Sequence, residues 1–513
     1  MRVTYLISTS FPLSYAYLSS IITFIHGSLL YLSNHYISSD VMSPLSMITR
    51  STQQPVLIIG SGLGGLTLAH SLAKHHIPYA IYERDSAASQ RAQGYRVSID
   101  EGGANGLRNA LDAKTFQRFE ETCAASNPVG GRIDGPSAKV LQRGILGLLG
   151  SGGLPMIFAL LYRFLLKRWE NGKWREWLWS WGEIYALDDT LMIVSTQPTP
   201  LRLPTAGDKH YQVDRRVLRS ILLSSQEHHI TYDSAFESYS ITNEGVIAKF
   251  ANGTTAAGSL LVGADGIKSK VAAQLVGDAA APLDLGLRII YGKTPLTPEV
   301  EDALHSTLRK GISFVTDRTV DGMKITLVLE TMRFPDTSAT ENYIFWALTT
   351  RKGGFMEDDQ RLLSLTGRQI ADLSIQFTKH WDPSIRVVFE KQAVFETAVL
   401  RVSSSDPDYP PTWDTNSRAT VLGDAVHCMP PTGGQGANAA MYDAALLGEV
   451  LAKSSRQEID GDGWDLGTIG RYEGALRYNI GDIVGLACVG AQHALGADSL
   501  EHIRARAEGR KTR

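Results

Sequence analysis

The sequence predicts an α/β protein in which a parallel sheet is interrupted by a second, mostly antiparallel sheet. Two glycine-rich turns at opposite ends of the chain and a strand-rich segment between them carry this prediction. The first turn covers residues 60–65 and the second covers residues 423–438. Each turn follows a short apolar run of the kind that forms a buried strand. Since either turn alone is a weak signal, the prediction depends on their occurring together.

The first turn lies within a βαβ pattern. Residues 55–59 (PVLII) are typical of a strand buried on both faces, and the glycines after them have the spacing Gly-x-Gly-x-x-Gly. Apolar residues then recur at helical spacing, and residues 79–82 read as a second strand that ends at Glu83. This order is typical of a Rossmann-like dinucleotide-binding unit.

Each residue of this pattern has an expected role. Gly60 permits the tight turn, Gly62 lets the backbone approach a pyrophosphate, and Gly65 lets helix and strand pack closely. Glu83 is placed to accept hydrogen bonds from an adenosine ribose. Dinucleotide binding is therefore favoured over a purely structural turn.

The second turn is predicted to hold the other end of the same cofactor. It supplies Asp424 at a strand end, the rigid corner Pro430-Pro431, and glycines that expose backbone N–H groups just before a helix. A helix N-terminus favours nearby negative charge, which a reduced flavin carries at its pyrimidine end. We therefore expect one extended cofactor, a flavin, that both turns bind.

The segment between the turns changes character after residue 282. Residues 287–291, 324–329, 343–348 and 386–389 read as strands, and a long helical stretch occurs only at about 359–380. The sequence thus predicts an inserted, mostly antiparallel sheet that binds the substrate. The predicted parts are a leader (1–52), a first cofactor-binding part (53–282, with an insert at 128–204), the sheet domain (283–395), a second cofactor-binding part (396–480) and a helical tail (481–513).

Composition narrows the function classes. The 513 residues are 43% hydrophobic, enough for two or three cores, and 50 basic against 53 acidic residues give a net charge of −3. This balance gives no reason to expect nucleic acid as a partner. The three cysteines are far apart and lack a C-x-x-C spacing, so neither a disulfide scaffold nor a metal site is expected. An intracellular location is favoured, either cytoplasmic or attached to an intracellular membrane.

Two segments leave membrane contact open. Residues 3–39 contain no charged side chain, and their apolar residues crowd between Tyr15 and Leu32, about the length of a membrane-spanning helix. Polar residues within that stretch favour a dispensable leader first, a signal anchor second and a secretion signal third. Five tryptophans at 169–181 lie among basic residues, which suits an interfacial membrane contact. A poorly ordered insertion or a lid over an apolar substrate is the alternative.

Taken together, three motifs resemble the single-component FAD-dependent monooxygenases of the para-hydroxybenzoate and salicylate hydroxylase type, especially fungal members in secondary metabolism. The motifs are the first turn with Glu83, the segment Gly263-Ala264-Asp265-Gly266, and the block 423–438. The resemblance covers roughly residues 55 to 478 and implies FAD as the cofactor, with NADPH or NADH as the electron donor. It implies a Rossmann-like FAD-binding domain with an inserted substrate sheet.

The resemblance also implies roles for individual residues. Glu83 would hold the ribose and Asp424 the ribityl or pyrophosphate region, and Asp265 belongs to a segment that serves both FAD and the donor. The remaining FAD-binding positions are Arg96, Arg215, Gly434, Gly436 and Ala437. The family usually continues the middle motif with Ser-x-Val-Arg, whereas this chain has Ala272 after Ser269-Lys270-Val271. Contact with the donor is therefore expected to differ, with Lys268 or Lys270 as substitutes.

The implied activity uses NAD(P)H and O2 to hydroxylate or epoxidise a hydrophobic small molecule, aromatic or polyketide-derived. Arg288 and Tyr291, on the first strand of the sheet domain, are the polar residues expected to face the substrate; a solvated Arg288 is the alternative. Two other functions stay open. One is an FAD-dependent dehydrogenase or reductase, and the other is a catalytically silent flavin-binding partner, perhaps tethered to a membrane.

Overall fold

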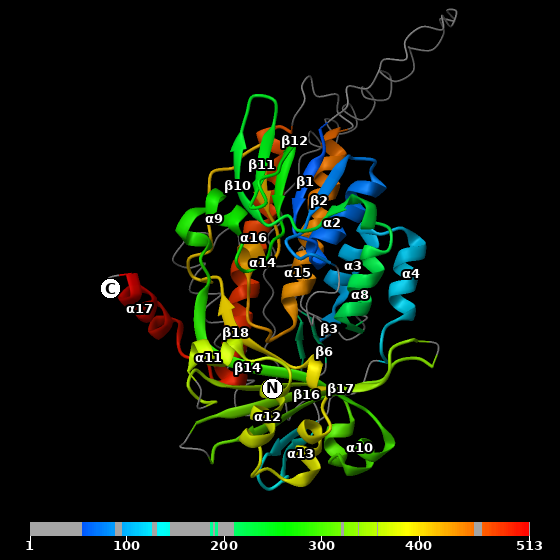
Figure 1. The fold of residues 1–513 in the computed structure, drawn as a ribbon, viewed down its shortest axis with the longest axis vertical. Coiled ribbons are helices and arrows are strands. Elements are labelled where there is room, and N and C mark those ends of the chain that lie inside the picture. The colour runs from blue at the N-terminus through cyan, green and yellow to red at the C-terminus, as the bar shows by residue number, and fades with distance from the viewer. Residues whose placement is uncertain are drawn as a thin grey trace, which may run out of the picture. The chain divides into compact units, whose positions relative to one another are not determined.

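The computed structural model describes residues 54–87, 95–125, 131–143, 185–187, 190–192, 210–319, 323–336, 338–355, 358–455 and 464–511. The predicted leader and the tryptophan-rich part of the insert lie outside these residues. The membrane contacts expected of them therefore stay predictions. Figure 1 shows the ribbon with its helices and strands labelled.

A five-stranded parallel sheet forms the cofactor-binding half. Its strands, in spatial order, are β19 (Ala419–Val421), β13 (Leu260–Gly263), β1 (Val56–Ile59), β2 (Tyr79–Tyr82) and β9 (Ile230–Thr231). The inner strands β1 and β13 and the edge strand β19 are buried at every residue, as their apolar composition predicts. Helix α2 (Leu63–Lys74) connects β1 to β2, so the predicted βαβ unit is present.

Strand β19 comes from the far end of the chain and pairs in parallel with β13. The second glycine turn is thereby brought to the same edge of the sheet as the first, because carboxyl ends of parallel strands meet at one edge. Long helices then pack on this sheet, among them α15 (Gln435–Ser455), which contacts both α2 and α3 (Glu101–Ala110).

A seven-stranded mixed sheet forms the second half, below the first in Figure 1. Its order is β18 (Ala398–Ser404), β14 (Leu283–Pro295), β17 (Tyr343–Arg351), β16 (Ile325–Met332), β15 (Ile312–Asp317), β4 (Gly131–Asp134) and β5 (Val140–Arg143). All pairings are antiparallel except that of β15 with β4. The sheet is therefore larger than the predicted segment 283–395. It takes its last two strands from the predicted insert 128–204, which no local pattern indicates.

Three smaller sheets complete the strands. They are β10-β11-β12 (Phe236–Ile241, Val246–Phe250, Thr255–Gly258), β3-β8 (Arg96–Ile99, Tyr211–Asp214) and β6-β7 (Tyr185–Leu187, Thr190–Met192). The other α-helices are α4 (Ala113–Glu121), α8 (Arg215–Leu223), α9 (Lys270–Leu275), α10 (Pro298–Ala303), α11 (Asp359–Ser364), α12 (Arg368–Phe377), α13 (Pro383–Glu390), α14 (Asp424–His427), α16 (Leu466–Gly490) and α17 (Leu500–Lys511).

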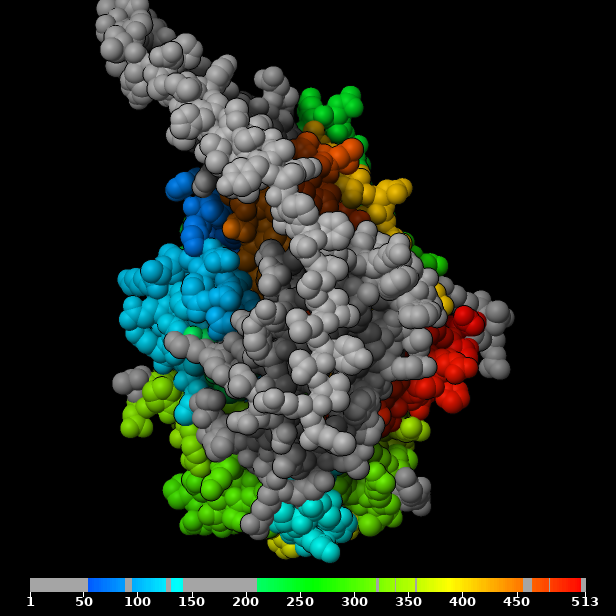
Figure 2. All heavy atoms as spheres, turned by 180° about the vertical axis from the view of Figure 1, so that it is seen from behind, coloured from blue at the N-terminus to red at the C-terminus, as the bar shows by residue number. Residues whose placement is uncertain are grey.

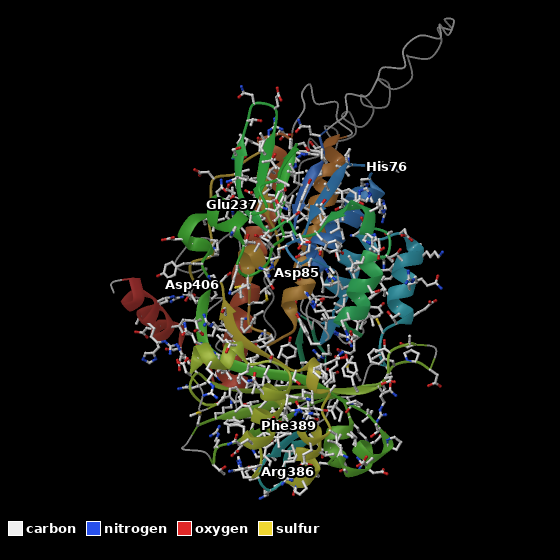
Figure 3. The ribbon with its side chains drawn as sticks, in the orientation of Figure 1. His76, Asp85, Glu237, Arg386, Phe389 and Asp406 are labelled. Carbon is white, nitrogen blue, oxygen red and sulfur yellow. The ribbon has the colours of Figure 1, made fainter. Side chains whose placement is uncertain are left out.

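The strand predicted at residues 386–389 is wrong, because this segment lies in α13. The Asp382 carboxylate accepts a hydrogen bond from the Ser384 backbone and Pro383 occupies the first turn, both strong signals for a helix start. Arg386 and Phe389 are labelled on this helix in Figure 3. Phe389 is fully buried and packs edge-on against Trp346, so its apolar side points into the core as a strand residue would.

Within the described part of the chain, no single helix is long and apolar enough to span a membrane. One bent pair, residues 466–495 with 500–508, meets the length and composition only when both parts are joined. Figure 2 shows α17, in red, at the surface, and this helix packs against β14.

The three cysteines are expected to resist thiol reagents in the folded protein. All are buried, and burial raises the pKa of Cys123 and of Cys428 to about 12. At neutral to mildly alkaline pH only a thiolate fraction on the order of 10⁻⁴ would react at these two positions. Titration with Ellman's reagent should therefore detect less than one thiol in native protein and all three after denaturation. Rapid modification of a native thiol would contradict the packing described here.

Candidate functional site

A cavity of about 1440 Å³ lies where the two glycine turns face the seven-stranded sheet. Its wall on the turn side includes Gly62 and Gly64 from the first turn and Asp424 with residues 429–434, 436 and 437 from the second. The opposite wall is one face of the sheet, with side chains from β14, β15, β16, β17, β18 and β4. The chain therefore brings its two predicted cofactor-binding turns to one cavity, together with the predicted substrate sheet.

The three glycines of the first turn are required for different structural reasons. Gly60 has a φ of +107°, and a Cβ at Gly65 would lie 2.1 Å from the Gly60 carbonyl oxygen, so these two positions fix the turn itself. Gly62 differs, because a Cβ there would meet no protein atom within 4 Å. Gly62 lines the cavity. Of Gly60, Gly62 and Gly65, only Gly62 therefore faces space that a ligand could fill.

Glu83 lies at the end of β2, where the first turn holds its carboxylate. Oε2 accepts hydrogen bonds from the Ser61 backbone N and from Ser61 Oγ, both at 2.8 Å, and Oε1 accepts one from the Asp85 backbone. Arg219 of α8 donates to Ser61 Oγ at 2.9 Å. Burial alone would raise the pKa of Glu83, but these hydrogen bonds and the nearby Arg219 outweigh it and lower the pKa. The carboxylate thus stays charged.

Sequence reasoning missed Ser61 and Arg219, although both complete the site around Glu83. Arg219 is only 7% exposed, which for an arginine requires partners. Arg219 follows Arg215 by four residues, and residues four apart share a helix face, so this spacing could have indicated that Arg219 belongs to the same site.

The second turn presents backbone to the cavity at its glycines. Gly433 and Gly434 have φ values of +86° and +67°, a left-handed conformation that favours glycine, and a Cβ at either would meet at most one atom, at 3.8 Å or beyond. Gly436 and Ala437 begin α15, and both line the cavity. Backbone N–H groups at this helix start are therefore accessible to an electronegative ligand atom.

Asp424 is the acidic group of this wall. Its side chain is open to the cavity but enclosed by protein on the other sides, and this enclosure raises the pKa of its carboxyl group; His427 and Arg215 oppose the shift. Its neighbour Gly423 donates a backbone hydrogen bond to Asp443, which also contacts His427 Nε2 at 2.6 Å. These buried contacts fix the turn that carries Asp424.

Asn438 connects the second turn to residues 98–100 by hydrogen bonds. Its side-chain amide donates to the Ser98 and Gly434 carbonyls and its oxygen accepts from the Asp100 backbone. Gln435 adds a hydrogen bond to the Asp100 carboxylate. Residues more than 330 positions apart in sequence are thereby held in one rigid wall.

Asp265 lies beside the cavity rather than in its wall. Its carboxylate accepts hydrogen bonds from Ser269 Oγ at 2.5 Å and from the Lys270 backbone at 2.9 Å, which ties the turn to the start of α9. The neighbouring Ala264 and Gly266 are the cavity residues of this motif. Ala272, the departure from the family pattern, is 1% exposed and packs in the core.

Arg215 and Arg96 both line the cavity, as does Tyr291. The Arg215 guanidinium lies 5.2 Å from the ring centre of Tyr95, and Tyr95 packs edge-on against Tyr291 at 5.6 Å. Arg96 forms an ion pair with Glu330 of β16. Burial raises the pKa of Tyr291 to about 12, so its phenol is a hydrogen-bond donor at neutral pH.

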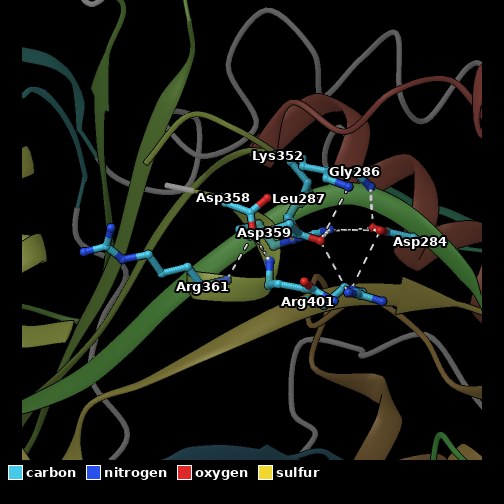
Figure 4. A network of polar contacts seen from close by, with 10 residues as sticks. Asp284, Gly286, Leu287, Lys352, Asp358, Asp359, Arg361 and Arg401 are labelled. Carbon is cyan, nitrogen blue, oxygen red and sulfur yellow. Dashed lines mark hydrogen bonds and ion pairs between the residues drawn. The ribbon is translucent and has the colours of Figure 1, made fainter. Parts of the chain in front are cut away.

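Arg288 does not face the cavity, which corrects the prediction for this residue. Its side chain is fully buried and makes ion pairs with Asp284 and Asp359, with N–O distances of 2.9 Å to each. Figure 4 shows these two carboxylates with Lys352 and Arg401 gathered around them. Residues three apart in a strand point to opposite faces, so Arg288 and Tyr291 could not both face the cavity. Arg288 therefore stabilises the sheet.

This geometry fits an extended, phosphate-containing cofactor. Open space in front of Gly62, Gly433 and Gly434 admits a ligand close to the backbone, and the start of α15 favours negative charge. Glu83 is not itself among the residues that line the cavity, and its carboxylate accepts hydrogen bonds from Ser61 and Asp85, so its expected contact with a ribose stays a prediction. The cavity volume exceeds what one such cofactor fills, so space for a second ligand lies against the sheet.

Two family models match the chain at these turns. A NAD(P)-binding Rossmann-like domain matches residues 58–122, and an FAD binding domain matches residues 411–465. The matched segments contain the first and second glycine turns. The prediction of FAD as the cofactor and of NAD(P)H as its electron donor is confirmed.

Several curated relatives are fungal proteins. The chain is 31% identical over 496 residues to the dual O-methyltransferase/FAD-dependent monooxygenase elcB of Phaeosphaeria nodorum. The aligned region covers 88% of this chain and 47% of that protein. It is 27% identical to the FAD-dependent monooxygenase dbaB of Emericella nidulans, covering 78% of this chain and 87% of that protein. The chain thus spans about half the length of the dual-function relatives that it matches.

Solved structures share the fold. Klebsiella pneumoniae HpxO complexed with FAD and uric acid superposes with a TM-score of 0.57 at 17% identity, over 89% of this chain and 92% of that one. The 2,6-dihydroxypyridine-3-hydroxylase of Arthrobacter nicotinovorans superposes with a TM-score of 0.59 at 13% identity, over 87% and 94%. The predicted fold class, a Rossmann-like domain with an inserted substrate sheet, is confirmed.

Proposed function

Because the chain belongs to the FAD-dependent monooxygenases of the para-hydroxybenzoate and salicylate hydroxylase type, we propose that it uses NAD(P)H and O2 to oxygenate a small molecule. The reaction would be a hydroxylation or an epoxidation of a hydrophobic aromatic or polyketide-derived compound. Fungal relatives of this kind support a role in secondary metabolism.

The single observation that carries the proposal is the shared cavity. Both glycine turns and the face of the sheet line it, so a flavin bound to the turns and a substrate bound to the sheet would be neighbours. A dehydrogenase on the same scaffold would use the same contacts, but the named relatives are monooxygenases. Oxygen transfer is therefore preferred to simple dehydrogenation.

The chain's own residues have defined tasks in this mechanism. FAD supplies the redox and oxygen chemistry when bound. Gly62 and the start of α15 would bind its phosphates and ring, and Glu83 and Asp424 would accept hydrogen bonds from its hydroxyl groups. Tyr291 would orient the substrate by donating its phenol proton in a hydrogen bond. The apolar face of the sheet would exclude water from the reacting atoms.

The proposal is tested by turnover of the FAD-loaded protein with candidate aromatic substrates. We expect NADPH oxidation coupled to O2 consumption, and a product that carries oxygen from ¹⁸O-labelled O2. The variant Asp424→Ala should fold, as judged by circular dichroism, but lose bound FAD and activity together, because a hydrogen-bond acceptor for the cofactor is removed. NAD(P)H oxidation with substrate conversion but no O2 uptake would instead establish a dehydrogenase. Absence of any NAD(P)H-dependent flavin bleaching would establish a silent flavin-binding protein.

A further inference from the structure

Three cationic side chains gather at one end of the cavity. Arg132 lies on β4, Arg318 directly follows β15, and Lys324 directly precedes β16. All three line the cavity, and Arg318 is exposed to it. We call Arg132, Arg318 and Lys324 the basic cluster.

Among the described residues, none forms an ion pair with the basic cluster. Lys324 Nζ donates to the His493 backbone carbonyl at 2.7 Å, which satisfies one proton without neutralising the charge. Arg132 Nε is buried without a hydrogen-bond partner. Two acids lie next to these residues in sequence but form no ion pair with them: the Asp134 carboxylate, which also lines the cavity, accepts from Ser137, and the Asp317 carboxylate accepts from Thr319, Trp381 and His380.

The three cations affect one another. Burial and the neighbouring Arg318 lower the pKa of Arg132, and burial together with Arg132 and Arg318 lowers the pKa of Lys324 to about 8. Three cations that repel one another in a cavity wall are unfavourable for folding unless a ligand offsets them. Such a cluster is typical of a site for a negatively charged group.

A row of residues in register connects the basic cluster to the flavin side of the cavity. Pairing across five strands places Tyr291, Ala347, Val328, Phe314 and Arg132 in line, and each of them lines the cavity. Tyr291 is the end that packs on Tyr95, beside Arg215. Four strand spacings of about 4.8 Å put roughly 19 Å between the two ends. The row therefore has an apolar middle and a cationic end that lies roughly 19 Å from Tyr291.

We propose that the substrate is an elongated aromatic acid, with more than one ring, whose carboxylate or ionised phenol binds the basic cluster. The proposal deepens the proposed function and rests on it, since it takes this cavity to be the substrate site. The apolar row would bind the ring system, and Tyr291 would lie at the end where oxygen is transferred. A single-ring acid would be too short to reach both ends.

The test compares anthracene-2-carboxylate with its neutral carboxamide as probes. Each is titrated into the FAD-loaded full-length protein without NAD(P)H, and binding is followed by the change in anthracene fluorescence. We expect the carboxylate to bind at least about tenfold more tightly than the amide. The triple variant Arg132→Met, Arg318→Met, Lys324→Met should lose this preference while its amide affinity stays within about twofold. Methionine retains much of the apolar stem and removes the charge, together with the hydrogen bond from Lys324 to the His493 carbonyl.

Matched variants and a competitor make the result decisive. Arg368→Met, at an exposed arginine on α12 away from the cavity, should leave the affinities of both probes unchanged. Relief of repulsion should leave the thermal midpoint of the triple variant equal to the wild type or higher. If that variant lost its FAD, the single variant Arg318→Met, at an exposed position, should still weaken carboxylate binding.

Equal affinity of the wild type for the two probes would overturn the proposal, as would an undiminished preference in the triple variant. Displacement of the carboxylate probe by adenosine 2′,5′-bisphosphate but not by AMP would assign the basic cluster to the 2′-phosphate of the electron donor. This result would also overturn the proposal. Because binding is measured without turnover, a failure of oxygenation would leave the acid preference intact. Likewise, a missing acid preference would leave oxygenation intact.

Discussion

Replacing Gly62 with alanine should weaken FAD binding by about tenfold or more, equivalent to about 1.4 kcal/mol, without destabilising the apoprotein. A Cβ at this position meets no protein atom within 4 Å, and φ and ψ of −73° and −179° suit alanine. Gly62 nevertheless lines the cavity, where the added methyl group would occupy space needed by the pyrophosphate. The effect should therefore fall on the ligand alone.

Gly65→Ala is the matched control with the opposite outcome. Its Cβ would lie 2.1 Å from the Gly60 carbonyl oxygen and 3.3 Å from the Ala264 side chain, so α2 must move away from β1. Overpacking against backbone is expected to lower the free energy of unfolding by about 3 kcal/mol.

Urea denaturation of both apoproteins and FAD titration by fluorescence quenching measure the two quantities separately. Wild-type FAD affinity in Gly62→Ala would show that the pyrophosphate does not approach the turn at this residue. An unchanged stability of Gly65→Ala would contradict the close packing of helix and strand.

Lys293→Met should lower the free energy of unfolding by about 3–5 kcal/mol, because it leaves a buried carboxylate without its cation. Lys293 of β14 forms an ion pair with Asp214 at the start of α8, and their exposures are 4% and 1%. Asp214 also accepts hydrogen bonds from the Arg216 backbone at 2.8 Å and from the Tyr343 hydroxyl at 3.1 Å. This pair joins the substrate sheet to the helix that carries Arg215.

Two further variants separate loss of charge balance from loss of packing. Lys293 also pairs with Glu396 at 3.3 Å, but Glu396 keeps its ion pair with Arg216. In the double variant Asp214→Asn, Lys293→Met the buried carboxylate is removed with the lysine and asparagine can still cap α8, so we expect most of the lost stability to return. Lys249→Met breaks an exposed pair between Lys249 and Glu237, whose side chains are 55% and 46% exposed, and should leave the free energy of unfolding nearly unchanged. A double variant as unstable as Lys293→Met would argue that packing of the lysine stem, not its charge, is what matters.

Local patterns were sufficient to predict the cofactor-binding half. Glycine spacing, apolar runs and the acid after the second strand each report a local requirement of the βαβ turn, so β1, α2 and β2 follow from the residues alone. The second turn is recognisable for the same reason, since Asp424 and its glycines lie directly between β19 and α15. The sequence also predicted that the two turns act on one ligand, and both turns do line one cavity.

The substrate side depended on pairing between distant strands. Nearly every residue of β14 is buried, so its sequence lacks the polar and apolar alternation that reveals which face points to a cavity. The prediction for Arg288 failed at this point, whereas Tyr291 does lie in the cavity wall. Similarly, β4 joins the sheet through a parallel pairing with β15 across 180 residues, and this pairing alone places Arg132 in the cavity.

The sequence by itself determined the nucleotide-binding turns, because glycine conformation and helix starts are set by neighbouring residues. Only the tertiary structure decided which side chains face the substrate, because strand register and sheet order are set by contacts between residues far apart in the chain. The basic cluster belongs to this second kind. Its three cations lie on separate segments and form one site only after the sheet has assembled.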